Sequence, residues 1–488
     1  MKLKNVLHDV GAVKIHGDPS TNIKGISYSS KTVEAGHLFA AMKGEETDGS
    51  CFISEAVANG AAAVLSERKS PRDFDRIWIQ VRDARESLSL CAANFYGNPS
   101  RQLEVVGVTG TKGKTTVVYI LEEILKQAKR KPGVISTISY RGPGLKRKAK
   151  RTTPESPDLQ NMMRKMLNKG ATHCIMEVSS HALELKRVTG TEFDVAVFTN
   201  LSGDHLDYHR SMGHYFEAKK KLFQTNSKQR TAVINLDDPW GKTLRSQLTT
   251  GVMTYGLQPA AMLYGENYVL TPQGIQLTVR HSAGKERFTS PLLGRPNVYN
   301  ILAATATAMT MNISPSKIRD GLARMNGVPG RFEKIKNRFG LHIYVDYAHT
   351  DAALESLLEM AKNLYEGKII LVFGAGGDRD KSKRPRMGKA AGKYADWSII
   401  TSDNPRSEDP LSIIRDIEKG LQNSGRGKYE IEPNRKKAIK KAIQMGKRGD
   451  VVLVAGKGHE NYQIIKNKIY DFDDAEVIKS FLNERGGH

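Results

Sequence analysis

The chain has 488 residues, of which 39% are hydrophobic and 26% charged, so its composition is that of an ordinary soluble globular protein and excludes disordered and fibrous classes. A chain of this length is expected to fold into two or three domains. The formal net charge of +23 is compatible with nucleic acid, an anionic surface or polyanionic small substrates as partners. However, no aromatic residues interleave the basic clusters as a base-stacking platform would require.

The N-terminal residues and the cysteines indicate in which cellular compartment the protein is expected. The first residues lack the apolar run of a signal peptide, and no later stretch approaches the length of a membrane span. Cys51, Cys91 and Cys174 are too few and too scattered for a disulfide framework or a zinc site. We therefore expect a cytoplasmic protein without membrane insertion.

The first hundred residues alternate short apolar runs, such as 36–42 and 61–65, with polar turns. The turn-rich stretch 96–100 is typical of a linker. A buried strand over 103–108, a glycine-rich turn and a helix over about 114–128 come next. The sequence thus predicts a small first domain joined to an α/β domain near residue 99.

Further elements repeat the alternation of strand and helix. A helical pattern at 158–168 is followed by buried runs at 172–176 and 195–199. This order predicts βαβ units and a mainly parallel sheet. A second α/β series begins near residue 330, with predicted strands at 342–345, 368–373, 397–401 and 450–455. The sequence therefore predicts an α/β fold of three domains: 1–98, 99–330 and 331–488.

Residues 107–116 lie between a predicted strand and a predicted helix. Their glycines let backbone N–H groups approach phosphates, and the helix N-terminus adds the positive end of its dipole. Lys114 would supply a point charge to the outer phosphates, and the Thr115 hydroxyl could join a Mg²⁺ shell. The strict pattern requires glycine where this chain has Val108, so a chance turn stays an alternative. The strand–loop–helix setting favours ATP or GTP binding.

Polar residues follow the next two buried runs. Glu177 comes directly after 172–176, and His205 lies in the segment 199–209. Sheets of α/β proteins bind ligands at the carboxyl ends of their strands, where a carboxylate and a histidine are suitable Mg²⁺ ligands, although this ion favours oxygen. The alternative is that these are surface turn residues or histidines that cap helices.

A different kind of ligand is indicated by three late segments at predicted strand ends: 374–380, 403–406 and 455–460. Arg379 and Arg406 offer planar forks that pair with carboxylates, and Glu460 can accept from an ammonium group. Such a set suits a zwitterionic amino acid with an extra carboxylate. The alternative is that Asp-Asn-Pro-Arg at 403–406 is only a turn, in which Arg406 bridges to Glu408.

Taken in order, these segments and 294–300, 330–333 and 346–349 resemble the Mur ligase family over nearly the whole chain. The resemblance implies the three-domain Mur ligase architecture, with a central P-loop ATPase-type parallel sheet and a C-terminal Rossmann-like α/β domain. It implies UDP-substrate binding by 1–98, ATP binding by 99–330 and amino-acid binding by 331–488. It further implies an ADP-forming amide ligase of peptidoglycan synthesis, which joins meso-2,6-diaminopimelate to UDP-N-acetylmuramoyl-L-alanyl-D-glutamate through an acyl phosphate.

The resemblance also implies roles for individual residues. ATP contacts are implied for Gly110, Thr111, Lys112, Gly113, Lys114, Thr115, Thr116, Asn300, Arg331 and Asp346. Mg²⁺ ligands are implied at Thr115, Glu177, His205 and Lys219 as a carbamate, and catalytic roles at Lys114, Glu177, His205, Lys219 and Arg331. The UDP-linked acceptor would contact Ser30, Thr152, Thr153, Ser179 and Arg187. Diaminopimelate would contact Arg379, Asp403, Asn404, Arg406, Gly456 and Glu460.

Two alternatives stay open. One is a paralogous amide ligase with another amino acid or carboxylate, because the chain departs from the family pattern at Ser29, Lys31, Lys112, Pro296 and Asp351. The other is a nucleic-acid-dependent ATPase, which the charge suggests although helicase-like and base-reading motifs are missing. On the favoured interpretation the partners are ATP, Mg²⁺ and the two substrates, with no specific nucleic acid, and the protein is a monomer.

Overall fold

The computed structural model describes residues 1–44, 47–204, 206–224, 231–249, 251–425, 427–466 and 468–485. The chain divides into two compact units. The first comprises Met1–Asn267, Thr278–Phe288 and Tyr299–Leu322, and the second comprises Tyr268–Leu277, Thr289–Val298 and Ala323–His488. None of the helices in the described ranges combines the length and the apolar character that a membrane span needs.

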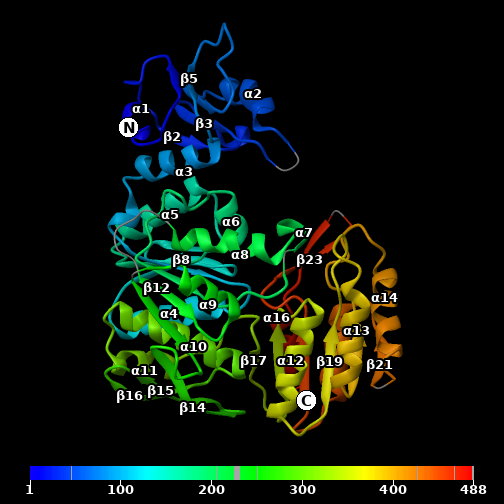
Figure 1. Cartoon of the computed structure of the whole chain (residues 1–488). Helices are drawn as coiled ribbons and strands as arrows, with labels where there is room; N and C mark the ends of the chain where they lie inside the picture. Colours follow the sequence, from blue (N-terminus) through cyan, green and yellow to red (C-terminus); the bar gives the residue numbers. More distant parts are fainter. Residues whose placement is uncertain are drawn as a thin grey trace. The chain divides into compact units, whose positions relative to one another are not determined.

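The N-terminal part of the first unit is built on a five-stranded sheet of order β1-β5-β4-β3-β2, drawn in blue in Figure 1. Strands β2 to β5 are parallel, and β1 is antiparallel to β5. Leu38 and Leu65 of the sheet pack with Leu88 of α3 in one core. The elements are α1 (Leu3–Val6), β1 (Lys14–His16), β2 (Gly25–Ser27), β3 (His37–Ala41), α2 (Ile53–Ala58), β4 (Ala63–Ser66), β5 (Ile77–Gln80) and α3 (Ala84–Phe95).

The central sheet of the first unit contains the parallel strands β13-β12-β11-β6-β10-β7 in that spatial order. Val105, Val106 and Val108 of β6 are fully buried, as expected of a parallel strand covered on both faces. These elements are β6 (Glu104–Thr109), α4 (Lys114–Gln127), β7 (Pro132–Ile135), α5 (Ser156–Asn168), β10 (His173–Glu177), β11 (Val195–Phe198), β12 (Thr231–Asn235) and β13 (Val252–Gly256). The predicted mainly parallel sheet is confirmed. The runs predicted at 103–108, 172–176 and 195–199 are β6, β10 and β11, with ends that differ by one residue, whereas β7, β12 and β13 were not predicted.

The same sheet extends beyond both edges of this parallel core, to β9 on one side and β16 on the other. The sequence patterns did not predict these outer strands. They are β8 (Ser139–Gly142), β9 (Leu145–Lys148), β14 (Leu263–Thr271), β15 (Gly274–His281) and β16 (Gly284–Ser290). The remaining helices are α6 (Ser180–Glu184), α7 (Leu206–His209), α8 (Met212–Lys220), α9 (Pro239–Ser246), α10 (Arg295–Thr310) and α11 (Pro315–Ala323).

The second unit contains a six-stranded sheet of order β17-β18-β22-β19-β20-β21, in which only β17 is antiparallel to its neighbour. A two-stranded sheet, β23-β24, is separate from it. The strands are β17 (Glu333–Ile335), β18 (His342–Asp346), β19 (Ile369–Phe373), β20 (Trp397–Ile400), β21 (Lys428–Ile431), β22 (Val451–Ala455), β23 (Tyr462–Ile465) and β24 (Lys468–Asp471). The helices are α12 (Asp351–Leu364), α13 (Lys383–Tyr394), α14 (Pro410–Gln422), α15 (Arg435–Met445) and α16 (Asp474–Arg485).

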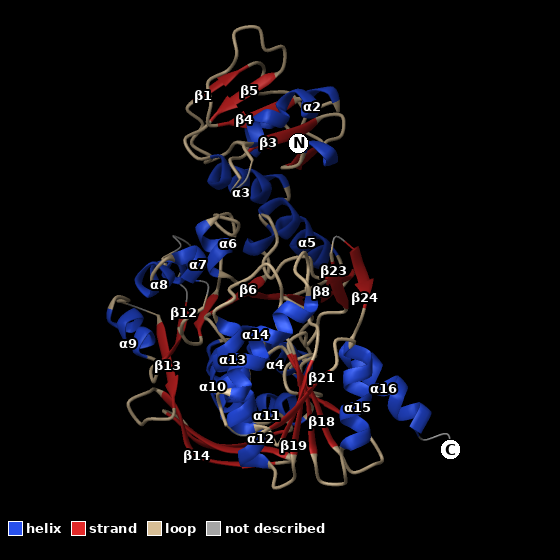
Figure 2. Cartoon of the chain, turned by 90° about the vertical axis from the view of Figure 1, so that its right-hand side faces the viewer, coloured by secondary structure: helices blue, strands red, loops and turns tan. Residues whose placement is uncertain are grey.

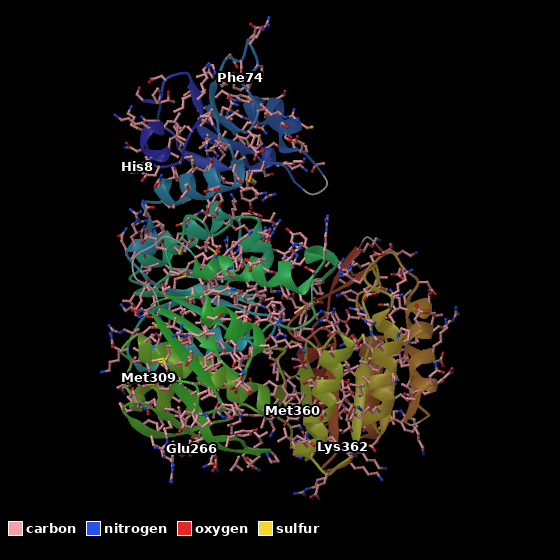
Figure 3. All side chains as sticks on the ribbon, in the orientation of Figure 1. His8, Phe74, Glu266, Met309, Met360 and Lys362 are labelled. Atoms are coloured by element: carbon pink, nitrogen blue, oxygen red, sulfur yellow. The ribbon has the colours of Figure 1, made fainter. Side chains whose placement is uncertain are left out.

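Helices cover both faces of this six-stranded sheet. Side chains of α12, α13 and α14 share a core with Leu371 and Leu453, whereas those of α15 and α16 pack with Val372 and Val452. The view in Figure 2 shows α15 and α16 lying together beside the strands. Figure 3 labels two side chains of α12: Met360 packs against the core and Lys362 is exposed. The predicted α/β class is confirmed.

Candidate active site

The glycine-rich loop between β6 and α4 is fixed in a conformation that needs glycine. Gly110 and Gly113 have φ angles of 145° and 88°. A Cβ on Gly110 would lie 1.9 Å from Thr199 Oγ1, and one on Gly113 would lie 2.4 Å from Asn300 Oδ1. The loop therefore packs closely against the end of β11 and against α10. This is how the structure brings Asn300 next to the predicted phosphate loop.

Hydrogen bonds from the end of β11 hold the loop. Asn200 Oδ1 accepts from Lys112 N at 3.0 Å, and Asn200 Nδ2 donates to Lys112 O at 3.1 Å. The Thr199 hydroxyl also donates to Lys112 O, at 2.7 Å. The Lys112 side chain itself is exposed, whereas Thr115 and Thr116 at the start of α4 are buried. The backbone of the loop is thus held by side chains at the end of β11.

Two lysine amines meet at one backbone carbonyl. Gly110 O accepts from Lys114 Nζ at 2.8 Å and from Lys219 Nζ at 2.9 Å, and Lys114 Nζ also donates to Thr111 O at 3.0 Å. Lys219 is 1% exposed and lies over the Tyr215 ring at 4.4 Å. Burial, reinforced by the charge of Lys114, holds the pKa of Lys219 well below its usual value, although Asp204 opposes the shift. This environment favours a neutral Lys219 amine.

The lysines that follow Lys219 behave differently. Lys220 pairs with Glu217 and Lys221 pairs with Glu184 near the surface, as expected of lysines on a solvated helix face. Only Lys219 of the three is buried, because α8 turns this side chain toward the phosphate loop. His205, predicted as a metal ligand, lies outside the described residues.

Glu177 ends β10, in register with Val108 on the neighbouring strand β6. Its side chain is fully buried, and its two carboxylate oxygens accept from Thr137 N at 2.8 Å and from the Thr137 hydroxyl at 3.1 Å. The Thr137 hydroxyl is also 3.0 Å from that of Thr152. Glu177 therefore offers carboxylate oxygens in a fixed orientation at the carboxyl edge of the sheet.

The residues predicted to bind the UDP-linked substrate and located near the central sheet form one hydrogen-bond network with Glu177. The Thr153 hydroxyl donates to Glu177 O at 2.9 Å and accepts from Ser179 N at 3.1 Å. Arg187 Nη1 donates to Thr153 O at 3.3 Å, and its Nε lies 2.8 Å from Glu155 Oε1. Thr152, Thr153, Ser179 and Arg187 are thus brought together.

Ser30 lies elsewhere in the first unit, just after β2 of the N-terminal sheet, where its carbonyl accepts from Asn59 Nδ2 at 3.0 Å. Two residues earlier, the Tyr28 hydroxyl donates to Asp158 Oδ2 on α5 at 2.7 Å. This bond fixes the strand end that carries Ser30 against a helix of the central sheet.

The donor set for a metal is oxygen-rich. Among the described residues, no group of three or more His, Cys, Asp and Glu side chains is arranged to hold a metal ion. The predicted set does not depend on such a group, because Thr115 contributes a hydroxyl and Lys219 would contribute carbamate oxygens. The buried Glu177 carboxylate and the Thr115 hydroxyl match the preference of Mg²⁺ for oxygen. The residues present therefore fit this ion.

Arg331 and Asp346 belong to the second unit. The Arg331 guanidinium lies 4.9 Å from the centre of the Tyr347 ring, and burial together with the Arg331 charge lowers the pKa of His459 to about 4. Asp346 accepts from Phe332 N at 2.6 Å through Oδ2 and from Ala348 N at 2.8 Å through Oδ1. Asp346 is thus fixed by two backbone hydrogen bonds, and the Arg331 guanidinium packs on the Tyr347 ring.

The predicted amino-acid residues gather at the carboxyl ends of β20 and β22. Asn404 Nδ2 donates to Glu460 Oε2 at 2.8 Å. Gly456 has a φ of 114°, and a Cβ on it would lie 2.5 Å from Asp403 Oδ2. Arg406 Nη1 donates to Gly377 O at 2.7 Å. One edge of the sheet therefore collects Asp403, Asn404, Arg406, Gly456 and Glu460.

The remaining predicted residue of this set, Arg379, is exposed and donates to Asp378 O at 3.1 Å. The structure also bears on the alternative pairing of Arg406 with Glu408. Glu408 is instead engaged by Arg384, at 2.8 and 3.0 Å, and lies 3.4 Å from Lys381. Arg384 also lowers the pKa of Glu408 to about 2. The guanidinium of Arg406 is thus directed toward the loop at Gly377 and not to that carboxylate.

Comparison with known proteins decides the family. Three family models match: "Mur ligase family, catalytic domain" at 22–96, "Mur ligase middle domain" at 108–308 and "Mur ligase, glutamate ligase domain" at 330–458. A protein of Solibacter usitatus is 44% identical, covering 96% of this chain and 95% of its own, and one of Geobacter metallireducens is 43% identical over 99% of both. Both are named UDP-N-acetylmuramoyl-L-alanyl-D-glutamate--2,6-diaminopimelate ligase. The chain belongs to the Mur ligase family.

Solved structures agree with this assignment. A structure titled UDP-N-acetylmuramoyl-L-alanyl-D-glutamate--2,6-diaminopimelate ligase superimposes with a TM-score of 0.72 and 33% identity, covering 98% of this chain and 99% of its own. A MurF ligase of Thermotoga maritima in complex with ADP shares the fold, with a TM-score of 0.64 at 22% identity over 94% of this chain and 98% of its own. As a Mur ligase, the protein is an ATP-dependent enzyme that forms an amide bond and releases ADP.

Several residues that hold the predicted site residues of this Mur ligase in place were not predicted from the sequence. Thr137 orients Glu177, Asn200 holds the phosphate loop, and Lys457 contacts both Asn404 and Glu460. Gln463 and Ile464 of β23 hydrogen-bond the segment 403–406. Apart from the pair of Lys457 with Glu460, these contacts join residues about 40 or more apart in the sequence, so no local pattern marks them. The Gly-Lys-Gly run around Lys457, directly after a buried strand, was the one available signal.

Proposed function

We propose that this Mur ligase adds meso-2,6-diaminopimelate to UDP-N-acetylmuramoyl-L-alanyl-D-glutamate with hydrolysis of ATP to ADP and phosphate. The observation that carries the proposal is the cluster of Asp403, Asn404, Arg406 and Glu460 at one sheet edge. It combines a guanidinium for a carboxylate with carboxylates for an ammonium group. A lysine side chain has no carboxylate at its far end and would leave the charge of Arg406 without a carboxylate partner. The names of the similar proteins support the same substrates.

In the first step the γ-carboxylate of the acceptor's D-glutamate attacks the γ-phosphorus of ATP, and ADP leaves with the electrons of the broken P–O bond. Both reactants are anions, so the step requires positive groups around them. The backbone N–H groups of the loop at Gly110 and Gly113, with Lys114 and Thr115, are our proposed ATP ligands. Asn300 would contact adenine, Asp346 the ribose and Arg331 the terminal phosphate. The close approach of Asn300 to Gly113 supports the assignments of the loop and of Asn300.

We also propose that Lys219 carries a carbamate. The reaction joins the neutral amine to CO₂ and releases one proton, so it needs an amine with a lowered pKa. Burial and Lys114 supply that condition. Thr115, Glu177, His205 and the carbamate would hold Mg²⁺, whose chemistry is to offset the negative charge of the phosphates. The acceptor itself would be bound by Ser30, Thr152, Thr153, Ser179 and Arg187.

In the second step the neutral amine of diaminopimelate attacks the acyl carbon, phosphate leaves, and the amine loses its proton. The amino-acid site positions this amine by holding the other end of the molecule. Arg406 and Arg379 would bind its carboxylate, and Asp403, Asn404, Gly456 and Glu460 would bind the ammonium side. Water must be kept from the acyl phosphate during this step.

The same proposal includes the organisation of the chain. We divide it into 1–98, 99–330 and 331–488, for substrate, ATP and amino-acid binding, and the three separate family matches support this division. We propose a cytoplasmic location, because ATP and UDP-linked precursors are cytoplasmic substrates, and we propose a monomeric state.

The test uses the purified protein with ATP, Mg²⁺, the UDP-linked dipeptide and either meso-diaminopimelate or L-lysine. We expect ADP release that requires the dipeptide and diaminopimelate together. Release with L-lysine or another amino acid instead would identify a paralogous ligase. Release that needs no dipeptide and is stimulated by DNA would overturn the ligase assignment in favour of a nucleic-acid-dependent ATPase.

A further inference from the structure

The segment Gly456-Lys457-Gly458 follows β22 with an arrangement that its sequence does not suggest. Gly456 and Gly458 have φ angles of 114° and 53°. A Cβ on Gly458 would lie 2.7 Å from Tyr347 Cβ and 2.8 Å from Gly330 O, so the turn is packed closely. A Gly-Lys-Gly run after a parallel strand would present its lysine to a phosphate in a typical nucleotide loop. Here the Lys457 side chain is 0% exposed and points into the protein.

The contacts of the Lys457 amine lie within the proposed amino-acid site. Nζ donates to Asn404 Oδ1 at 3.1 Å and is 3.4 Å from Glu460 Oε2. It also lies 5.5 Å from the centre of the Tyr462 ring. A buried ammonium group needs a charge partner and hydrogen bonds, and these contacts supply both.

The position of this amine decides which way the Asn404 amide faces. Asn404 Oδ1 accepts from Lys457 Nζ and, at 2.9 Å, from Ile464 N, so two donors hold the oxygen. The amide nitrogen must then face Glu460, to which it donates at 2.8 Å. With a residue at position 457 that cannot donate a hydrogen bond, one of the two donors that hold the oxygen is lost.

The same amine changes the charge that the site offers to a substrate. The nearby carboxylates are Asp403, Glu460 and Asp474, and the buried cations are Lys457 and Arg435, of which Arg435 is paired with Asp474 at 2.7 Å. Lys457 thus offsets Glu460, while Asp403 interacts with Lys383 and Arg435. Without the Lys457 charge, the site would present one more uncompensated carboxylate to the amino acid.

We propose that Lys457 is a positioning residue that sets amino-acid specificity: it fixes the Asn404 amide and offsets the Glu460 carboxylate, so that the site takes one ammonium group together with a carboxylate. This inference rests on the proposed role of 403–406 and 455–460 in amino-acid binding. It assigns Lys457 no direct contact with ATP or with the reacting atoms.

The experiment compares Lys457→Gln, which can still donate to Asn404, with Lys457→Met, which has neither charge nor donor. Lys457→Gln is expected to raise KM for diaminopimelate about tenfold, and Lys457→Met about 100-fold, with KM for ATP within about twofold of the wild type. The preference for diaminopimelate over L-lysine, measured as the ratio of the two kcat/KM values, should fall in both Lys457 variants. Ile439→Val, which trims the core of the same unit, is the control for a purely structural loss and should leave both KM values unchanged.

A double-mutant cycle with Glu460→Gln tests the route of the effect. If Lys457 acts through Glu460, Lys457→Gln should change KM for diaminopimelate much less in the Glu460→Gln background. Equal effects in both backgrounds, an unchanged KM in folded Lys457→Gln, or a parallel rise of KM for ATP would each overturn the proposal. If Lys457→Met does not fold, the proposal is tested with Lys457→Gln and with the double variant Lys457→Gln/Glu460→Gln. The double variant buries no unpaired charge.

The wild-type assay separates this inference from the proposed function. If the wild type releases ADP with a different amino acid, the proposed substrate is wrong, and the same KM comparison is made with that amino acid. A raised KM would then still support Lys457 as a positioning residue, and an unchanged one would overturn it.

Discussion

Two buried cations, one in each unit, are held in different ways. In the first unit, Lys219 donates to the carbonyl of Gly110, which also accepts from Lys114, and the pKa of Lys219 is well below its usual value. In the second unit, Arg435 is fully buried but makes two hydrogen bonds of 2.7 Å to Asp474. Burial alone would lower the pKa of Arg435, but Asp474 more than offsets this and raises it.

The difference separates reactive cations from structural ones. A buried amine beside a neutral carbonyl and a second cation is destabilised as an ammonium ion, so it is available as a nucleophile or for modification. A guanidinium with two carboxylate hydrogen bonds is locked in its charged form and serves to join elements, here α15 to α16. Burial by itself therefore does not tell which role a cation has, whereas its partner does.

The largest effect is expected for the reactive amine. Lys219→Ala should reduce turnover by at least about 10³-fold, because the proposed carbamate and its metal contact are lost together. Steady-state ADP release measures the loss, and added acetate or formate should restore part of the activity by replacing the carbamate oxygens. Lys220→Ala, which removes a neighbouring lysine paired with Glu217, should be nearly silent. Normal turnover of Lys219→Ala would show that the carbamate assignment is wrong.

A mutation in the ion pair of Arg435 and Asp474 should lower the stability of the protein and leave the catalysed reaction unchanged. Asp474→Asn leaves Arg435 buried without its charge partner and should lower the free energy of unfolding by about 3–5 kcal/mol. Denaturant titration checks this. Lys479→Met on the same helix, which breaks an exposed pair with Glu476, should cost less than about 1 kcal/mol. A loss as small for Asp474→Asn as for Lys479→Met would remove the distinction between buried and exposed pairs.

Arg406 tests a third kind of cation, one directed at a substrate. Arg406→Ala should lower kcat/KM for diaminopimelate by about 2–5 kcal/mol in free-energy terms, since the carboxylate of the substrate loses its partner. Its thermal stability should change little, because the side chain makes one hydrogen bond to a loop carbonyl. Arg386→Ala, which removes an exposed arginine paired with Asp351, is the matched control. An unchanged kcat/KM would exclude Arg406 from the amino-acid site.

The parallel strands were predictable because buried parallel strands are short, nearly continuous apolar runs. The run at 103–108 became β6 (Glu104–Thr109), and the predicted helix after it became α4 (Lys114–Gln127). Strands β8, β9 and β14 to β16 were missed because their residues are partly exposed and rich in charge, as in Leu145–Lys148. The buried strands β7 and β12 were missed as well, so burial alone did not make a strand predictable.

In the candidate site, too, residues with a local sequence pattern could be predicted and residues defined by distant contacts could not. Gly110 and Gly113 could be assigned from sequence because local backbone conformation and close packing both require glycine. The burial of Lys219 could not, since a helix with three consecutive lysines gives no sign of which one turns inward. Likewise the partners Thr137 and Lys457 depend on contacts between segments about 40 or more residues apart.

The smallest effect is expected where a cation is only half-buried. Lys186 lies 2.8 Å from Asp83 Oδ2 and 2.5 Å from Glu86 Oε2, so it links the loop after α6 to the start of α3, but 37% of its side chain is exposed. Solvent screening weakens the attraction in such ion pairs, so Lys186→Met should lower the free energy of unfolding by about 0.2–1 kcal/mol. This loss should be smaller still at 1 M salt. Denaturant titration at low and high salt measures both values. A loss of several kcal/mol that salt does not reduce would show that partner type, and not burial, sets the strength of an ion pair in this protein.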